Sequence, residues 1–275
     1  MNRFKTSAAG IITATIALAL ASPADAALQC GDQLKKDVTL KKNLNCTGES
    51  VNGVNVDKDD VTVDLNNNKI ITDSGYSPIR NDDGYDGLTV KDGSLEGGQY
   101  GIYNYYGSQA TFSDLKIDPA GDDTGYGIYQ QYSLGPKATD IVVKDPSYGW
   151  YGYSNVGLKL KDFTVTGEDN SNGYGVNESY TTGVIDKLKA NHAYYGAYLS
   201  SNSSGLTIKN SVMNDAGYAG IYVSNSTPLF DYKYTLKDNV ANDADDYGFY
   251  ASYDVFGGGN KAKGAGTENC YNVSC

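Results

Sequence analysis

The chain has 275 residues, and its 33 acidic and 22 basic side chains give a formal net charge of −11. Twenty of the basic residues are lysine, so the chain lacks the arginine-rich basic surface typical of proteins that bind nucleic acids or anionic membranes. Its 33 glycines with only six prolines exclude a collagen-like chain and a proline-rich disordered one. The length allows one large domain or two ordinary ones.

The first 26 residues have the pattern of an export signal. Arg3 and Lys5 precede an uncharged apolar run over 8–21, and Ala24-Asp25-Ala26 supplies a small-x-small cleavage site. The apolar run is shorter than the ~20 residues that a membrane-spanning helix needs. We therefore expect residues 1–26 to be removed, leaving a secreted, extracellular protein without a membrane span.

The four cysteines form two pairs, one near each end of the exported chain: Cys30 with Cys46, and Cys270 with Cys275. An even number of cysteines outside the cytosol favours disulfides, for which three connectivities exist. Zinc is the alternative, but no C-x-x-C spacing and no histidine lies near either pair.

A tyrosine–glycine motif recurs through the middle of the chain, first as Tyr100-Gly101-Ile102-Tyr103 and then as Tyr126-Gly127-Ile128-Tyr129. The repeated glycines are Gly101, Gly127, Gly149, Gly175, Gly196, Gly220 and Gly248. Their spacing in the twenties indicates a solenoid, in which each repeat stacks on the previous one.

A second marker accompanies the motif. It is an acidic or amide residue that follows or punctuates a strand-like stretch: Asp92, Asp114, Asp140, Asp162, Asp186, Asn210 and Asp238. The first three glycine-to-marker intervals are equal, whereas the marker-to-glycine intervals vary. This pattern predicts a coil with one rigid arc, its corner at the glycine, and one extensible loop.

The repeats are rich in Val, Ile, Thr and Tyr with two-residue alternation, which favours strands over helices. We therefore predict an all-β parallel solenoid of about eight coils, stacked ~4.8 Å apart. A disulfide between the two cysteine pairs would have to bridge the whole rod, so we expect Cys30–Cys46 and Cys270–Cys275 to close its two ends. Residues 27–275 then form one domain, with an N-terminal cap and first rungs over 27–72, repeat coils over 73–260 and a C-terminal cap over 261–275.

The segments around the cysteines resemble the caps of secreted right-handed parallel β-helix-repeat proteins of the pectin-lyase-like superfamily. The similar stretches are Cys30-Gly31, Asp37-Val38-Thr39-Leu40, Leu44-Asn45-Cys46-Thr47-Gly48, Val61-Thr62-Val63-Asp64-Leu65-Asn66 and Asn269-Cys270-Tyr271-Asn272-Val273-Ser274-Cys275. The resemblance implies a right-handed parallel β-helix and an extracellular carbohydrate context, but it does not fix one activity.

The sequence does not identify a catalytic residue. The N-T-D, G-H-G and R-I-K motifs of polygalacturonase-type hydrolases are missing, and adjacent Asp-Asp pairs are typical of turns. Lyases of this fold need a basic residue and Ca²⁺. Arg80 is the only arginine outside the export signal, and Asp82, Asp83 and Asp86 are weak candidate calcium ligands. We assign no role to His192, the only histidine.

Alternation within the motif predicts one outward column of side chains: Arg80, Tyr103, Tyr129, Tyr151, Asn177, Tyr198, Tyr222 and Tyr250. Its six tyrosines are candidates for stacking on sugar rings. They could instead only stack on one another, with Arg80 against Tyr103. We predict a secreted, monomeric, noncatalytic protein that binds extracellular or cell-envelope polysaccharide. The alternatives are a diverged polysaccharide lyase or glycoside hydrolase, and a purely structural surface protein.

Overall fold

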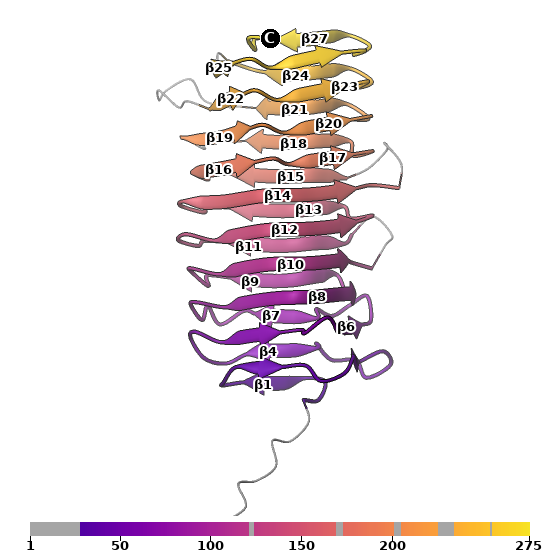
Figure 1. The fold of residues 1–275 in the computed structure, drawn as a ribbon, viewed down its shortest axis with the longest axis vertical. Coiled ribbons are helices and arrows are strands. Elements are labelled where there is room, and N and C mark those ends of the chain that lie inside the picture. The colour runs from indigo at the N-terminus through magenta and orange to yellow at the C-terminus, as the bar shows by residue number, and fades with distance from the viewer. Residues whose placement is uncertain (1–27, 121–123, 169–172, 201–204, 225–233, 254) are drawn as a thin grey trace, which may run out of the picture.

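The computed structural model describes residues 28–120, 124–168, 173–200, 205–224, 234–253 and 255–275. The expected export signal lies outside these residues. Within them the chain is all-β and without a helix, and its strands pair in parallel from coil to coil. Figure 1 shows the coils stacked along one long axis, from β1 (Asp32–Leu34) at one end to β27 (Glu268–Tyr271) at the other. The predicted parallel β-solenoid is confirmed.

One sheet takes a single strand from each coil and has eleven strands in the described residues. Between β1 and β27 these are β4 (Val54–Val56), β7 (Ile79–Asn81), β9 (Tyr100–Tyr105), β11 (Tyr126–Gln131), β13 (Tyr148–Tyr153), β15 (Tyr174–Ser179), β18 (Tyr195–Ser200), β21 (Ala219–Ser224) and β24 (Tyr247–Ala251). Each copy of the tyrosine–glycine motif lies in one strand of this sheet, from β9 to β24. Together with β7, which carries Arg80, these strands form the eight predicted rungs, and the cap strands extend the sheet beyond them.

A second sheet covers the other two faces of the coil and has sixteen strands in the described part of the chain. Four long strands cross both faces: β8 (Thr89–Gly97), β10 (Thr111–Asp118), β12 (Lys137–Lys144) and β14 (Leu158–Thr166). Toward the ends the same path is split into shorter strands: β2 (Val38–Thr39), β3 (Leu44–Asn45), β5 (Thr62–Asp64), β6 (Lys69–Thr72), β16 (Gly183–Asp186), β17 (Lys189–Asn191), β19 (Leu206–Lys209), β20 (Val212–Asn214), β22 (Thr235–Lys237), β23 (Val240–Asn242), β25 (Phe256–Gly258) and β26 (Lys261–Lys263).

The aspartate marker is the corner between these two faces. Asp92, Asp114, Asp140 and Asp162 have φ values of 50–60° in the middle of the four long strands. Aspartate and asparagine tolerate this left-handed conformation better than most side chains do. The predicted marker Asp186 is displaced by one residue, because Lys187 takes the left-handed corner with a φ of 60°.

The repeated glycine is not a corner, contrary to expectation. Gly101 lies inside β9 and faces the interior, where a Cβ would stand 2.7 Å from the carbonyl oxygen of Gly127 on the next rung and overlap Ile117. The glycine therefore permits close approach between rungs and across the interior. The rigid corner is formed by the aspartates instead.

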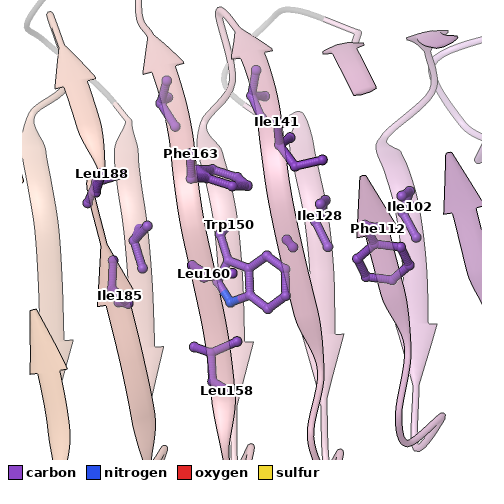
Figure 2. Close-up of a cluster of buried hydrophobic side chains, with 14 of the residues drawn as sticks. Ile102, Phe112, Ile128, Ile141, Trp150, Leu158, Leu160, Phe163, Ile185 and Leu188 are labelled. Carbon is purple, nitrogen blue, oxygen red and sulfur yellow. The ribbon is translucent and has the colours of Figure 1, made fainter. Parts of the chain in front are cut away.

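The interior is filled by apolar side chains that stack in register. Ile102, Ile128 and Trp150 lie on successive rungs of one sheet and are fully buried. Figure 2 shows them inside the coil with Phe112 and Phe163 of the opposite sheet. The disulfides Cys30–Cys46 and Cys270–Cys275 lie near the two ends, with Cα–Cα distances of 5.6 and 6.4 Å, so the predicted pairing is confirmed.

Candidate functional site

The six tyrosines predicted to share an outward column do so. The column reads Arg80, Tyr103, Tyr129, Tyr151, Asn177, Tyr198, Tyr222, Tyr250 and then Tyr271, each residue paired in register with the next. The rings of Tyr103 and Tyr129 have centroids 5.0 Å apart and planes 7° apart, and those of Tyr222 and Tyr250 lie 4.5 Å and 5° apart.

A second tyrosine column lies beside the first. It contains Tyr100, Tyr126, Tyr148, Tyr174 and Tyr195, with centroids of successive rings 4.7–5.2 Å apart. Edge-to-face contacts join the columns, such as Tyr126 with Tyr151 at 5.7 Å and 90°. Tyr174 also contacts Tyr198 at 5.7 Å and so bypasses Asn177. We call the two columns together the tyrosine face.

The second column was not predicted from the sequence. Simple alternation places Tyr100 on the same side of the strand as the core residue Ile102. In the structure Gly101 and Ile102 are both buried, and Tyr100 and Tyr103 both point outward. The signal was present, because a tyrosine precedes the repeat glycine in most copies of the motif.

The ring faces within each column are covered by the rings above and below. Such stacking contributes about 0.5–1.5 kcal/mol for each pair beyond the area buried. The outer surface therefore consists of ring edges and phenol groups. Partial burial, reinforced by neighbouring phenols, raises the pKa of Tyr126 and Tyr222 to about 12 and also raises that of Tyr129. These three phenols are thus protonated and uncharged near neutral pH.

The strands of the tyrosine face carry almost no charge. In the strands of this sheet that carry the face, namely β9, β11, β13, β15, β18, β21 and β24, the only Asp, Glu, Lys or Arg is Glu178. Its side chain is fully buried. Arg80 marks one end of the first column, where its guanidinium lies 4.6 Å from the ring centroid of Tyr103 and pairs with Asp82 at 2.9 Å. The chain is strongly acidic as a whole, but this surface is neutral.

A row of tyrosines follows at the corner that ends the tyrosine face. Tyr106, Tyr132 and Tyr180 have φ values of 62, 53 and 54° and are 53, 39 and 44% exposed. A bulky side chain in this conformation costs on the order of 1–2 kcal/mol. These tyrosines were also missed from the sequence, although each stands five residues after a repeat glycine.

Of the weak candidate calcium ligands, Asp82 and Asp86 make other contacts within the protein. Asp82 pairs with Arg80, and the Asp86 carboxylate accepts a hydrogen bond from the Ser108 amide at 2.7 Å. Among the residues that the structure describes, no three Asp, Glu, His or Cys side chains, Asp83 included, gather in a group able to hold a metal ion.

The corner aspartates border a shallow groove of about 480 Å³ on the second sheet. Asp92, Asp114 and Asp140 line it together with Lys116 and Val142. These carboxylates occupy equivalent corners, whereas glycoside hydrolysis uses two carboxyl groups in different environments. We therefore assign the aspartates to the backbone bend and no catalytic role.

Nitrogen and sulfur donors are few and dispersed. His192, the only histidine, is exposed at a corner after β17, with a φ of 53°. All four cysteines are in disulfides, and Met213 is buried in the core. In the described residues no helix has the length and apolarity that crossing a bilayer requires.

Solved structures of the same fold include the catalytic domain of a GH87 α-1,3-glucanase in complex with nigerose and two variants of it. They superpose with TM-scores of 0.53–0.54 at 13% identity. They are matched over 90% of this chain but only 63% of theirs, so the chain spans less than two thirds of their length. At this identity the likeness concerns the fold alone.

Sequence comparisons identify the family. No curated protein sequence matches the chain significantly. The model of one protein family, described as periplasmic copper-binding protein (NosD), matches residues 108–271, which contain the strands from β10 to β27. Because this match covers more than half of the sequence, the chain belongs to the NosD family.

Proposed function

We propose that this protein binds an extended, uncharged glycan along the tyrosine face without cleaving it. The observation that carries the proposal is the neutrality of this face on a strongly acidic protein. Phenol groups repeat at each rung, about 4.8 Å apart, and each can donate and accept a hydrogen bond. Sugar hydroxyls have the same capacity. A polyuronate would be repelled by the acidic chain.

The ring geometry changes how we expect the glycan to contact this face. Because the columns cover their own ring faces, a glycan lying along the solenoid axis meets phenols and ring edges rather than open rings. Binding there relies on hydrogen bonds, and the rigid columns have little side-chain entropy left to lose. The self-stacked columns thus both stabilise the solenoid and present the hydroxyl array.

The relatives support a glycan and an exported location. The GH87 neighbours share the fold and act on a glucan, as their description states. The NosD family is described as periplasmic, and two disulfides indicate an oxidising compartment. Together with the export signal expected from the sequence, these features favour the periplasm or the extracellular space.

Copper binding, which the family description names, does not fit this chain's donors. Copper is held by imidazole, thiolate and thioether ligands. The chain has a single histidine, its cysteines are oxidised in disulfides, and Met213 is buried in the core. We therefore assign no copper-dependent step to it.

The test is a pull-down with insoluble α-1,3-glucan, cellulose and xylan, with calcium polygalacturonate as the acidic comparison. We expect a neutral glycan to retain the protein, and the double replacement Tyr129→Ala/Tyr151→Ala to reduce retention. Lys137→Ala, on the exposed side of β12, is the control. The supernatants are assayed for new reducing and unsaturated ends. Their appearance would favour a hydrolase or lyase, and no retention on any glycan would contradict the proposal.

A further inference from the structure

A second surface, which we call the corner ridge, runs beside the tyrosine face. It consists of Tyr106, Tyr132, Ser154 and Tyr180 on successive rungs. The ladder of backbone hydrogen bonds aligns them, because the amides of Tyr106, Tyr132 and Ser154 donate to the rung above at 3.0, 2.9 and 2.9 Å. All four residues have left-handed φ values, between 53 and 62°.

The corner ridge is more exposed than the tyrosine face. Its three tyrosines are among the exposed large hydrophobic side chains of the described residues, whereas the tyrosines of the two face columns from β9 to β24 are only partly exposed. Leu134 and Val156, which form an isolated parallel bridge next to the ridge, are 59 and 52% exposed. Together these side chains make an apolar strip along the solenoid axis.

The tyrosines of the corner ridge are held in place by one another and by tyrosines at the ends of β9 and β13. Tyr106 stacks on Tyr132 at 4.9 Å, and Tyr105 packs edge-on against Tyr106 at 4.4 Å. Tyr153 contacts both Tyr132 and Tyr180 at 5.3 Å and so bridges the rung of Ser154. The exposed rings are therefore oriented before any ligand arrives.

The backbone does not account for tyrosine at these positions. Most other left-handed corners are taken by aspartate, asparagine or glycine, which adopt this conformation with less strain, and the exceptions, such as Gln109, Lys187 and His192, carry polar side chains. Strain that persists at exposed side chains points to a use for those side chains. Exposed aromatic rings beside aliphatic groups match the apolar C–H face of a pyranose ring, with the phenols available for its hydroxyls.

We infer that the corner ridge is where sugar rings stack, as the aromatic part of the same glycan site whose hydrogen-bonding part is the tyrosine face. The inference rests on the proposed function, because it requires that the protein bind an uncharged glycan. A glycan chain then runs parallel to the solenoid axis along the edge between the two surfaces. Its sugar faces lie on Tyr180 and on the sides of the Tyr106 and Tyr132 rings that are not stacked on each other.

The experiment replaces the ridge tyrosines by asparagine, which tolerates the left-handed corner. In Tyr132→Asn/Tyr180→Asn we expect roughly tenfold weaker retention on whichever of α-1,3-glucan, cellulose or xylan holds the wild-type protein best. The unfolding temperature should stay equal or rise, because strain is relieved. A purely structural ridge would show the reverse, with lower stability and unchanged retention. Gln109→Asn, at another exposed left-handed corner, is the matched control.

The converse variant adds the missing ring. Ser154→Tyr should tighten retention and lower the unfolding temperature, because it extends the ridge but places a bulkier side chain at a corner that is already left-handed. If the asparagine variants bind as well as wild type while Tyr129→Ala/Tyr151→Ala does not, the ridge inference is wrong and the proposed function stands. If the wild-type protein binds none of the three glycans, both are wrong.

Discussion

Gly152 lies directly against the buried carboxyl group of Glu178 on the next rung. The two residues pair in register on β13 and β15, and a Cβ at position 152 would overlap the carboxylate. That carboxyl group accepts hydrogen bonds from Trp150 Nε1 and Thr181 Oγ1. The missing side chain of Gly152 thus provides the space in which the solenoid interior holds an acid.

Replacing this glycine should therefore destabilise the protein. Gly152→Ala must displace the Glu178 carboxyl group from its two donors, and overpacking of this kind costs about 1–3 kcal/mol. The free energy of unfolding, measured in denaturant, checks the value. In a Glu178→Ala background the same replacement should cost much less, since the overlap is gone. Equal costs in both backgrounds would show that the two residues do not interact.

Glu178 should also make stability depend on pH. Burial raises its pKa to about 8, against opposing hydrogen bonds from Thr181, Trp150 and Asn155. Below about pH 4.5 the native and unfolded chains are both protonated at this residue. Between about 4.5 and 8 only the unfolded chain ionises, so stability falls with rising pH, by ~3 kcal/mol at pH 7.

Glu178→Gln isolates this contribution, because the amide keeps an acceptor for Trp150 but does not titrate. The unfolding free energies of the variant and the wild type should diverge progressively from pH 5 to pH 8, with the variant the more stable at the upper end. Among neighbouring groups, Tyr151 titrates above this window, because burial raises its pKa from its usual value near 10. Parallel pH curves for the two proteins would contradict the prediction.

The sequence predicted the repeat, the strand type, the disulfides and the first tyrosine column, because each follows from spacing, alternation and composition along the chain. It did not predict the role of the glycine. Close approach of Gly101 to Gly127 depends on the neighbouring rung, which no single repeat reveals. Tyr100 was missed because two consecutive residues of β9 face inward, and Tyr106 because tyrosine is not typical of a left-handed corner.

The gap in the first tyrosine column offers a gain-of-stability test. Asn177 lies in register between Tyr151 and Tyr198, and it is the one residue between Tyr103 and Tyr250 in that column without a ring. Asn177→Tyr should add two stacked contacts and raise the free energy of unfolding by about 1–3 kcal/mol. Thermal unfolding measures the change. A loss of stability would mean that the edge contact of Tyr174 with Tyr198 already fills this space.

The two disulfides should contribute unequally, because they close loops of different length. Cys30–Cys46 spans 16 residues and Cys270–Cys275 spans five, for which loop entropy predicts about 3 and 2 kcal/mol. Cys46 is also fully buried, so its replacement removes packing as well. Because rungs contact mainly their neighbours, loss of either bridge should expose backbone amides at its own end first. Hydrogen exchange of Cys30→Ala/Cys46→Ala should therefore accelerate over β1 to β6, with β11 to β15 still protected. Uniform acceleration along the rod would show that the solenoid unfolds as one cooperative unit and that the caps stabilise all of it.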